Sequence, residues 1–402
     1  MLVVFCLLLL LICVLEFILL IKDDGIVSGL LISIKNTIES RNTKTAIEYC
    51  LSRIKGMLVD VLPHVRFRKK DNILEIAYSP LGGLGDYIIS KCVLEEILAI
   101  TDCRVDLYCE NEEFGNAIYS DVVSTFVPYR QYDLKRHNYD LALSVEHFVH
   151  VNNMDDRRVK VIAPALYKKM KYIQDNWSSL YVPISKQHWR ERVHFDRCSC
   201  LSLNRWSELR MGGVFSITKK IVSIPMHEEF KGWLNNNSEK QYITINYGAD
   251  SMRKNQNQIK VWPKEYYERL IVLLNKLRPN INVIQLGARE STRITGCDDY
   301  LLGESLEQTK WVLHNSLCHI DCEGGLVHLA TQLGTRCIVL FGPTPEFMYA
   351  YPQNINIRNP ECSACMGFHR DWAYKCFKGF DKPICMYGIT PEMIITELVR
   401  IL

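Results

Sequence analysis

The stretch that decides the fold is residues 319–344, which read HIDCEGGLVHLATQLGTRCIVLFGPT. Its pattern predicts a short strand, a Glu-Gly-Gly turn, a helix over 326–333 and a second, apolar strand over 336–341. A helix that begins directly after two glycines, at the carboxyl edge of a parallel sheet, attracts anions through its free amides and its dipole. The stretch therefore predicts an α/β unit with a candidate anion-binding turn.

The same alternation of strands and helices extends over most of the chain. Its 402 residues favour two domains. The run ILEIAY at 73–78 opens the first pattern, and apolar runs at 105–109, 122–128, 139–145 and 159–164 continue it as strands. The run QYITIN at 241–246 opens the second, followed by a helix at 264–277. We therefore predict two doubly wound α/β domains, over 73–215 and 216–402.

The amino-terminal residues predict a membrane anchor. Residues 1–21 are apolar except for Glu16 and are long enough to cross a bilayer as a helix. A cleaved signal peptide is the alternative, but no Lys or Arg precedes the run and no small-x-small cleavage pattern follows it. An uncleaved anchor in the cytoplasmic membrane is favoured, followed by a helical stem over 22–72. The cations just after the run place the domains in the cytoplasm: Lys22, Lys35, Arg41 and Lys44.

The cysteine content agrees with a cytoplasmic location, and the net charge bears on the possible partners. The net charge of +3 gives no sign of nucleic-acid binding. Most of the 16 cysteines are single and lie in apolar runs, as reduced core cysteines do. A basic cluster, RFRKK at 66–70, is equally well read as a solvated linker end or as a contact for anionic lipid headgroups.

Three motifs occur in an order that resembles a known family. The pattern E-G-G-L-x-H-L-A with L-F-G-P-T at 323–344 resembles the donor-binding segment of the ADP-heptose (heptosyltransferase-like) glycosyltransferases of family 9. The turn G-G-L-G-D at 82–86 and the segment K-V-W-P at 260–263 match further motifs of that family. The family is usually written D-[ST]-G-x-x-H-L-A, so Glu323 and Gly324 are departures from it.

The resemblance implies the GT-B architecture, in which two Rossmann-like domains face each other across a cleft. It also implies inverting, metal-independent transfer of a heptose or related sugar from a nucleoside diphosphate sugar. The acceptor would be a hydroxyl of a glycan, a lipid-linked glycan or a protein, in the synthesis of cell-surface glycoconjugates such as lipopolysaccharide. No cofactor is implied for catalysis.

Individual residues take roles from the same resemblance. Asp86 would be the catalytic base, in an acceptor-side loop with Gly83 and Gly85. The structural alternative is that Asp86 only caps the helix that begins near Tyr87. The implied donor-binding residues lie in the second domain: Gly248, Lys260, Glu290, Glu323, Gly324, Gly325, His328, Gly342 and Thr344.

Four cysteines near the carboxyl terminus are spaced like a metal site. Cys362 and Cys365 form a C-x₂-C pair, and Cys376 and Cys385 follow in a segment without regular periodicity. Four thiolates can surround a structural zinc or iron ion. A comparable tail in the autotransporter heptosyltransferases holds iron, so the resemblance favours a structural metal here, either zinc or iron. The alternative is a set of reduced cysteines packed under a loop.

Two other functions are compatible with these patterns. A sugar-nucleotide epimerase shares the GT-B architecture and needs no acceptor. A non-catalytic, membrane-tethered sugar-nucleotide binder would keep the glycine turn and have no use for Asp86. An assay for sugar transfer distinguishes both from a transferase.

Overall fold

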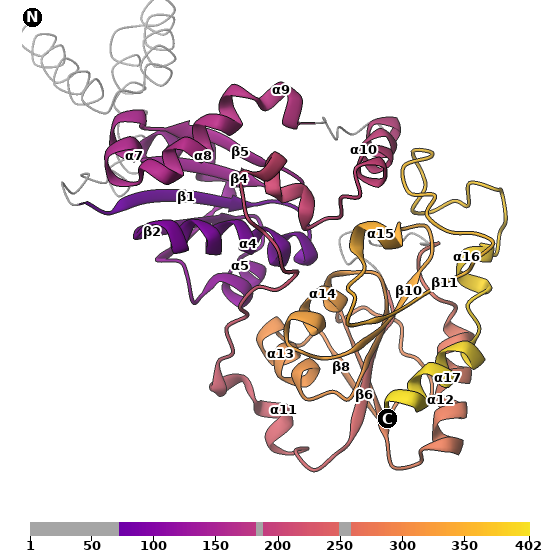
Figure 1. Ribbon diagram of the computed structural model, residues 1–402. Coiled ribbons are helices and arrows are strands. Elements are labelled where there is room, and N and C mark those ends of the chain that lie inside the picture. The colour runs from indigo at the N-terminus through magenta and orange to yellow at the C-terminus, as the bar shows by residue number, and fades with distance from the viewer. Residues whose placement is uncertain (1–71, 182–187, 249–258) are drawn as a thin grey trace, which may run out of the picture. The chain divides into compact units, whose positions relative to one another are not determined.

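The computed structural model describes residues 72–181, 188–248 and 259–402, which form two α/β halves (Figure 1). The predicted anchor, residues 1–21, and all but the last residue of the predicted stem lie outside the described residues. Among the helices within the described ranges, none combines the length and the apolar character that crossing a membrane requires.

The first half is built on a five-stranded sheet with the order β3-β2-β1-β4-β5. All its strand pairs are parallel except β4 with β5, which is antiparallel. Helix α4 contacts both α5 and α8, and Lys169 of α8 donates a hydrogen bond to Glu96 of α4 at 3.1 Å, so these three helices lie on one face of the sheet (Figure 1). Tyr132 and Tyr139 pack on the other face. The strands are β1 (Leu74–Pro80), β2 (Cys103–Cys109), β3 (Thr125–Pro128), β4 (Leu141–Val145) and β5 (Val149–Met154), and the helices are α4 (Leu84–Ile100), α5 (Glu112–Tyr119), α6 (Tyr132–Lys135), α7 (Asp156–Ile162) and α8 (Pro164–Asp175).

One predicted strand of this half is wrong. The run at 159–164 forms the end of helix α7 and the start of α8, and the fifth strand is β5, just before it. The Asp155 side chain caps α7 by accepting a hydrogen bond from the amide of Arg158 at 3.1 Å. Pro164 at the first turn of α8 also favours a helix, since its fixed φ suits that position.

The second half is a six-stranded, fully parallel sheet with the order β11-β10-β9-β6-β7-β8. The predicted helix at 264–277 agrees with the observed α12 residue for residue. The strands are β6 (Tyr242–Asn246), β7 (Asn282–Gly287), β8 (Asp299–Leu302), β9 (His319–Cys322), β10 (Cys337–Phe341) and β11 (Ile355–Arg358), and the helices are α12 (Lys264–Leu277), α13 (Leu306–His314), α14 (Gly325–Gln332), α15 (Glu346–Tyr349), α16 (Ile384–Tyr387) and α17 (Pro391–Ile401).

The segment between the two sheets contains short helices that its sequence did not predict. It comprises α9 (Trp177–Leu180), α10 (His188–Cys200), the 3-10 helices η4 (Ser207–Gly213) and η5 (Glu228–Phe230), and α11 (Gly232–Asn235). The predicted boundary between residues 215 and 216 falls in this segment and stays a prediction. The doubly wound α/β character of both halves is confirmed, and each glycine-rich turn follows the carboxyl end of a parallel strand, β1 or β9.

Candidate functional site

A cleft of about 2090 Å³ is lined by residues of both halves. Such a volume exceeds that of an ordinary small-ligand pocket and leaves room for a donor and an acceptor together. The predicted residues that line it are Gly83, Gly85, Asp86, Gly248, Lys260, Glu290, Glu323, Gly324, Gly325, His328 and Thr344. Gly342 is not among the lining residues: a methyl group there would point at Met386 and at Cys385 Sγ, 3.6 Å away.

Asp86 enters the cleft from the first turn of α4 and has two sets of partners. Its Oδ2 accepts a hydrogen bond from the Gly83 amide at 3.0 Å, which is the bond of a helix cap. Its Oδ1 accepts hydrogen bonds from Arg205 Nε at 3.2 Å and Nη2 at 2.8 Å. Burial opposes ionisation, but Arg205, His147 and these hydrogen bonds outweigh it and hold the pKa of Asp86 below its usual value. Asp86 therefore caps its helix and also presents a carboxylate, 31% exposed, to the cleft.

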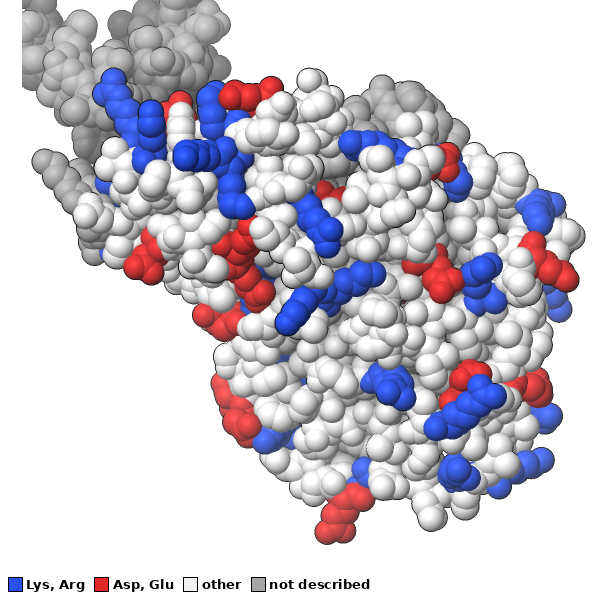
Figure 2. Space-filling model, in the orientation of Figure 1, with Lys and Arg blue, Asp and Glu red and all other residues white. Residues whose placement is uncertain are grey.

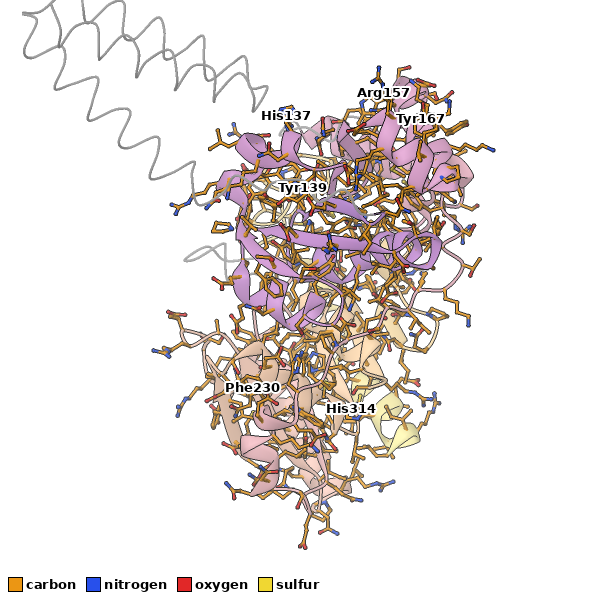
Figure 3. All side chains as sticks on the ribbon, turned by 90° about the vertical axis from the view of Figure 1, so that its left-hand side faces the viewer. His137, Tyr139, Arg157, Tyr167, Phe230 and His314 are labelled. Carbon is orange, nitrogen blue, oxygen red and sulfur yellow. The ribbon has the colours of Figure 1, made fainter. Side chains whose placement is uncertain are left out.

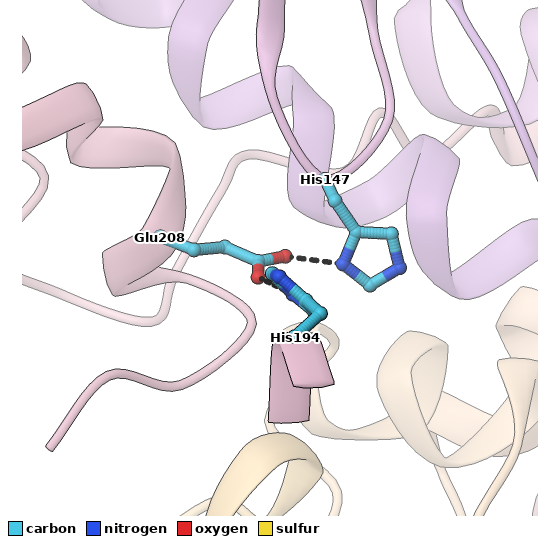
Figure 4. Close-up of side chains that lie close together, drawn as sticks. All are labelled: His147, His194 and Glu208. Carbon is cyan, nitrogen blue, oxygen red and sulfur yellow. Dashed lines mark hydrogen bonds and ion pairs between the residues drawn. The ribbon is translucent and has the colours of Figure 1, made fainter. Parts of the chain in front are cut away.

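Arg205 joins Asp86 to a buried polar cluster behind it. Its guanidinium is fully buried and donates to Glu208 Oε1 at 2.7 Å and to the carbonyl of Glu146 at 2.7 Å. Glu208 in turn accepts hydrogen bonds from His147 Nδ1 at 2.7 Å and His194 Nε2 at 2.9 Å. Figure 4 shows the two imidazoles meeting the two oxygens of one carboxylate. The cluster fixes the guanidinium, which in turn fixes the carboxylate of Asp86.

The opposite wall of the cleft carries a second carboxylate, Glu323, just before α14. Lys260 Nζ lies 3.9 Å from its Oε2, and His328 Nε2 lies 3.5 Å from its Oε1. Burial opposes ionisation of Glu323, yet Lys260 and His328 outweigh it, and its pKa is below the usual value. The other ring nitrogen of His328 bonds the Tyr351 hydroxyl at 2.7 Å. This wall combines a lysine with the positive end of α14, the arrangement that binds phosphate groups.

Buried aromatic packing positions Lys260. Trp262, two residues further on, is fully buried, and its indole nitrogen donates to the carbonyl of Ile389 at 2.8 Å. Its amide donates to Cys322 Sγ at 3.3 Å, at the end of β9. The segment K-V-W-P is thereby attached to the strand that leads into Glu323 and α14. The contacts of Trp262 consequently hold both Lys260 and the glycine turn in place.

Two glycines allow the helices α4 and α14 to meet across the cleft. A methyl group on Gly85 would lie 2.5 Å from His328 Cδ2, and one on Gly325 would lie 2.9 Å from Leu84 Cβ. Real Cβ atoms essentially never come that close to other atoms. Gly85 and Gly325 therefore have a packing role in addition to their place at the cleft.

The four cysteines of the tail lie near one another, but they do not form a compact group. Burial, followed by the neighbouring thiols of Cys362, Cys365 and Cys376, raises the pKa of the Cys385 thiol to about 12. The knuckle is attached to the turn after β10, because the amide of Ala364 donates to the carbonyl of Gly342 at 3.0 Å. Across the described residues, no three of these sulfur atoms lie within 4.8 Å of one another. The metal site at the tail stays a prediction.

Several polar residues of the site were not predicted from the sequence. Arg205 and Glu208 lie in the connecting segment, where the sequence has no periodicity that would have singled them out. Asn246 is the last residue of β6, and Asp321 is the last but one of the neighbouring β9. The side-chain amide of Asn246 donates to Asp321 Oδ2 at 3.0 Å and to the carbonyl of Gly248 at 2.9 Å. Their position at two adjacent strand ends was a signal that could have found them.

Comparison with known proteins was made at three levels. Residues 220–376 match the model of glycosyltransferase family 9 (heptosyltransferase). No curated protein sequence matches the chain at a significant level. Solved structures of several bacterial enzymes share the fold.

Among these structures is the ADP-heptose LPS heptosyltransferase II of E. coli, with a TM-score of 0.52, 16% identity, and coverage of 82% of this chain and 98% of that one. A family 9 glycosyl transferase from Veillonella parvula has a TM-score of 0.51 and 14% identity, and the match covers 82% of this chain and 99% of that one. A third structure is the dodecameric, iron-containing heptosyltransferase TibC of enterotoxigenic E. coli in complex with ADP-D-beta-D-heptose. Its TM-score is 0.50 at 12% identity, and the match covers 83% of this chain and 77% of that one. At such identities the likeness shows the shared fold. Residues 220–376 are therefore similar to glycosyltransferase family 9, and the chain shares the fold of the solved heptosyltransferases.

Proposed function

We propose that this protein is an inverting glycosyltransferase that moves a heptose or related sugar from a nucleoside diphosphate donor, ADP-heptose or a relative, to a hydroxyl acceptor. The observation that carries the proposal is the composition of one cleft. An ionised carboxylate, Asp86, lies on one wall, and Lys260 with the amino end of α14 lies on the other. The match of residues 220–376 to the family 9 (heptosyltransferase) model supports the choice of donor.

The reaction divides between the two walls. Asp86 accepts the proton of the acceptor hydroxyl while its oxygen attacks the anomeric carbon. The bond between that carbon and the diphosphate oxygen breaks, and the nucleoside diphosphate leaves with the negative charge. Lys260 and the backbone amides at Gly324 and Gly325, which line the cleft, stabilise that charge, so the proposed step needs no metal ion. Glu323 holds sugar hydroxyls, and one in-line displacement inverts the anomeric centre.

The first test is a thermal-shift screen of the purified protein against ADP-heptose, with GDP-mannose and UDP-N-acetylglucosamine for comparison. A donor at a hundred times its Kd should add about 2.7 kcal/mol of stability. Incubation of that donor with candidate acceptors should then release nucleoside diphosphate only when an acceptor is present. Absence of binding by every sugar nucleotide would contradict the proposal, and free epimerised sugar nucleotide would indicate the epimerase instead.

We also place the enzyme at the cytoplasmic membrane, with residues 1–21 as its anchor and a glycan, lipid-linked or protein acceptor. The apolar run at 1–21 and the cations after it support this location. Lys and Arg side chains gather over α7 and α8 (Figure 2), where Arg157, Lys160 and Lys168 are exposed. Figure 3 shows Arg157 at the same end of the first half as Tyr167. Such a basic surface suits anionic headgroups.

Deletion of residues 2–21 tests the anchor. The shortened protein should leave the membrane fraction at high salt and keep its activity, because the described fold begins after residue 71. If it still sediments with membranes at high salt, residues 1–21 are not the anchor. If sedimentation persists only at low salt, the basic cluster at 66–70 or the basic surface over α7 and α8 binds the headgroups.

For the tail we propose a structural zinc or iron ion held by Cys362, Cys365, Cys376 and Cys385. The C-x₂-C spacing of Cys362 and Cys365, with two further cysteines in the same tail, supports the donor set, and thiolate sulfur suits both metals. The Cys365→Ser variant should lose about one metal ion per chain together with thermal stability. An unchanged metal content would contradict this site.

A further inference from the structure

The polar cluster behind Asp86 brings together side chains from three separate segments of the first half. His147 comes from the turn between β4 and β5, His194 from α10 and Glu208 from η4 (Figure 4). All three precede the segment that the family model matches. Nothing in the proposed transfer reaction uses either imidazole. The cluster therefore needs an explanation of its own.

The geometry of the cluster is that of a set of metal ligands. One ligand atom from each of His147, His194 and Glu208 lies within 4.8 Å of the other two, and they are the one such group in the part of the chain that the structure describes. The side chains of His194 and Glu208 are 1% and 2% exposed. Two imidazoles and one carboxylate are also the protein ligands of many zinc and non-haem iron sites.

A fourth donor approaches the same point. Cys198 lies four residues after His194, so both project from one face of α10. Its Sγ is 3.6 Å from His194 Nε2 and 3.9 Å from Glu208 Oε2. The side chain of Cys198 is buried and does not face solvent. Imidazole nitrogen, carboxylate oxygen and thiolate sulfur are the three ligand types that zinc accepts in a closed tetrahedral site.

Charge balance favours a cation at this place. Glu208 and Asp86 share the guanidinium of Arg205, which bonds Glu208 Oε1 at 2.7 Å and Asp86 Oδ1 at 2.8 Å. The two carboxylates carry two negative charges and the guanidinium carries one positive charge. One negative charge therefore has no fixed counter-charge beside the buried carboxylate of Glu208. A buried charge is costly unless a counter-charge or a metal ion compensates it. A divalent ion bound by the cluster would supply the missing positive charge.

We propose that His147, His194, Cys198 and Glu208 bind a structural zinc ion. Binding requires the ring nitrogens that face Glu208 to present lone pairs, so each imidazole proton moves to the opposite ring nitrogen, and the thiol proton of Cys198 is released into solvent. The ion ties α10 and η4 to the turn after β4, and through Arg205 it helps to hold Asp86 in place. It is separate from the cysteine tail and takes no part in the transfer step, so the proposal stands or falls independently of the donor and the acceptor.

The main experiment counts metal ions in the full-length protein, purified without chelator and equilibrated with zinc. It uses the Cys365→Ser background, which removes any contribution of the tail. About one zinc per chain should remain in that background and should be lost when Glu208→Gln is added. His150→Asn is the matched control, because His150 is a half-buried histidine of β5 whose ring packs at a tilt against Trp177, with centroids 4.5 Å apart, and it is not one of the cluster's ligands. Zinc-free protein in the Cys365→Ser background, or zinc retained after Glu208→Gln, would overturn the proposal.

A second measurement does not depend on the buried glutamate. In the same Cys365→Ser background, cobalt(II) substituted for zinc should show a thiolate charge-transfer band, which Cys198→Ser removes while the control Cys103→Ser leaves it unchanged. Cys103 is also a free cysteine of the first half, at the start of β2. A cobalt spectrum that Cys198→Ser leaves unchanged would remove Cys198 from the site, and with it the proposed ligand set. Circular dichroism of each variant separates loss of metal from loss of fold.

Discussion

The two glycine-rich turns of this protein look alike in sequence and hold their carboxylates in different ways. Each follows a parallel strand and opens a helix, α4 after β1 and α14 after β9. In the first, Asp86 lies inside the helix and accepts hydrogen bonds from its own turn and from a fully buried arginine. In the second, Glu323 precedes the helix, and its cation is Lys260, which lines the cleft.

The difference separates a carboxylate with a fixed position from one whose partner can be shared with a ligand. Arg205 is bonded to Asp86, to Glu208 and to a backbone carbonyl, so it has no freedom to follow a substrate. Lys260 lies 3.9 Å from Glu323, longer than a hydrogen bond, and can reach a phosphate in the cleft without breaking a tight pair. This difference supports the proposal that the first turn takes the proton and the second binds the donor.

The largest expected effect comes from Asp86→Asn. The amide can still accept a hydrogen bond from Gly83, so the helix cap survives, but it cannot take a proton from the acceptor. Transfer should fall by roughly 10²- to 10⁴-fold with little change in donor affinity, measured by steady-state kinetics and donor titration. The control is Asp102→Asn, an exposed aspartate just beyond the other end of α4. Near-normal turnover of Asp86→Asn would leave Asp86 as a helix cap alone.

Lys260→Ala should act on the other side of the comparison. Loss of a charge-assisted contact to phosphate costs about 1.5–3 kcal/mol, which corresponds to a rise in donor Kd of roughly 10- to 100-fold. Wild-type affinity should also weaken with added salt, and that dependence should be shallower in the variant. Isothermal titration measures both. Lys276→Ala, at the exposed end of α12, provides the matched loss of charge, and an equal effect of the two substitutions would remove Lys260 from the donor site.

Gly85→Ala tests whether the two turns must touch. The new methyl group would lie 2.5 Å from the buried ring of His328, which Tyr351 holds by a hydrogen bond. Overpacking of this kind costs about 1–3 kcal/mol, offset in part by the better helix propensity of alanine, about 1 kcal/mol. We expect a net loss of unfolding free energy in urea titrations and a displaced His328. The control is Gly83→Ala, whose methyl group has only Asp86 Oδ2 within 4 Å, at 4.0 Å. Equal stability of the two variants would show that α4 and α14 can move apart at no cost.

The sequence predicted the parts of the site that lie at the ends of regular elements. Asp86, Lys260, Glu323 and His328 all line the cleft, since a turn after a parallel strand brings its residues to one edge of the sheet. Gly342, chosen by the same logic, instead faces the cysteine tail, because that tail occupies the space beside it. A motif fixes where a residue lies in the chain, but it does not fix what packs against it.

The residues that the sequence did not predict come from irregular structure. Arg205 and Glu208 belong to a connecting segment whose short helices have no apolar periodicity, and their partners are distant in sequence: Asp86 is 119 residues from Arg205. Charge in a loop usually indicates solvent exposure, so a fully buried arginine there could not be expected. The run at 159–164 failed for a different reason, since short apolar runs fit a strand and a buried helix equally well.

The smallest expected effect concerns the pH dependence of stability at Glu323. Its folded pKa is below the unfolded value of about 4.3, because Lys260 and His328 outweigh burial. Its ionic contribution is therefore present above about pH 5 and is lost as the pH falls through the folded pKa. Glu323→Gln removes that contribution, so the stability gap between wild type and variant, on the order of 1 kcal/mol at pH 6, should narrow below pH 4. The exposed Glu290, replaced by Gln, is the control. Urea unfolding at each pH measures the gap, and a gap that stays constant or widens in acid would show that Lys260 does not stabilise the Glu323 carboxylate in the folded protein.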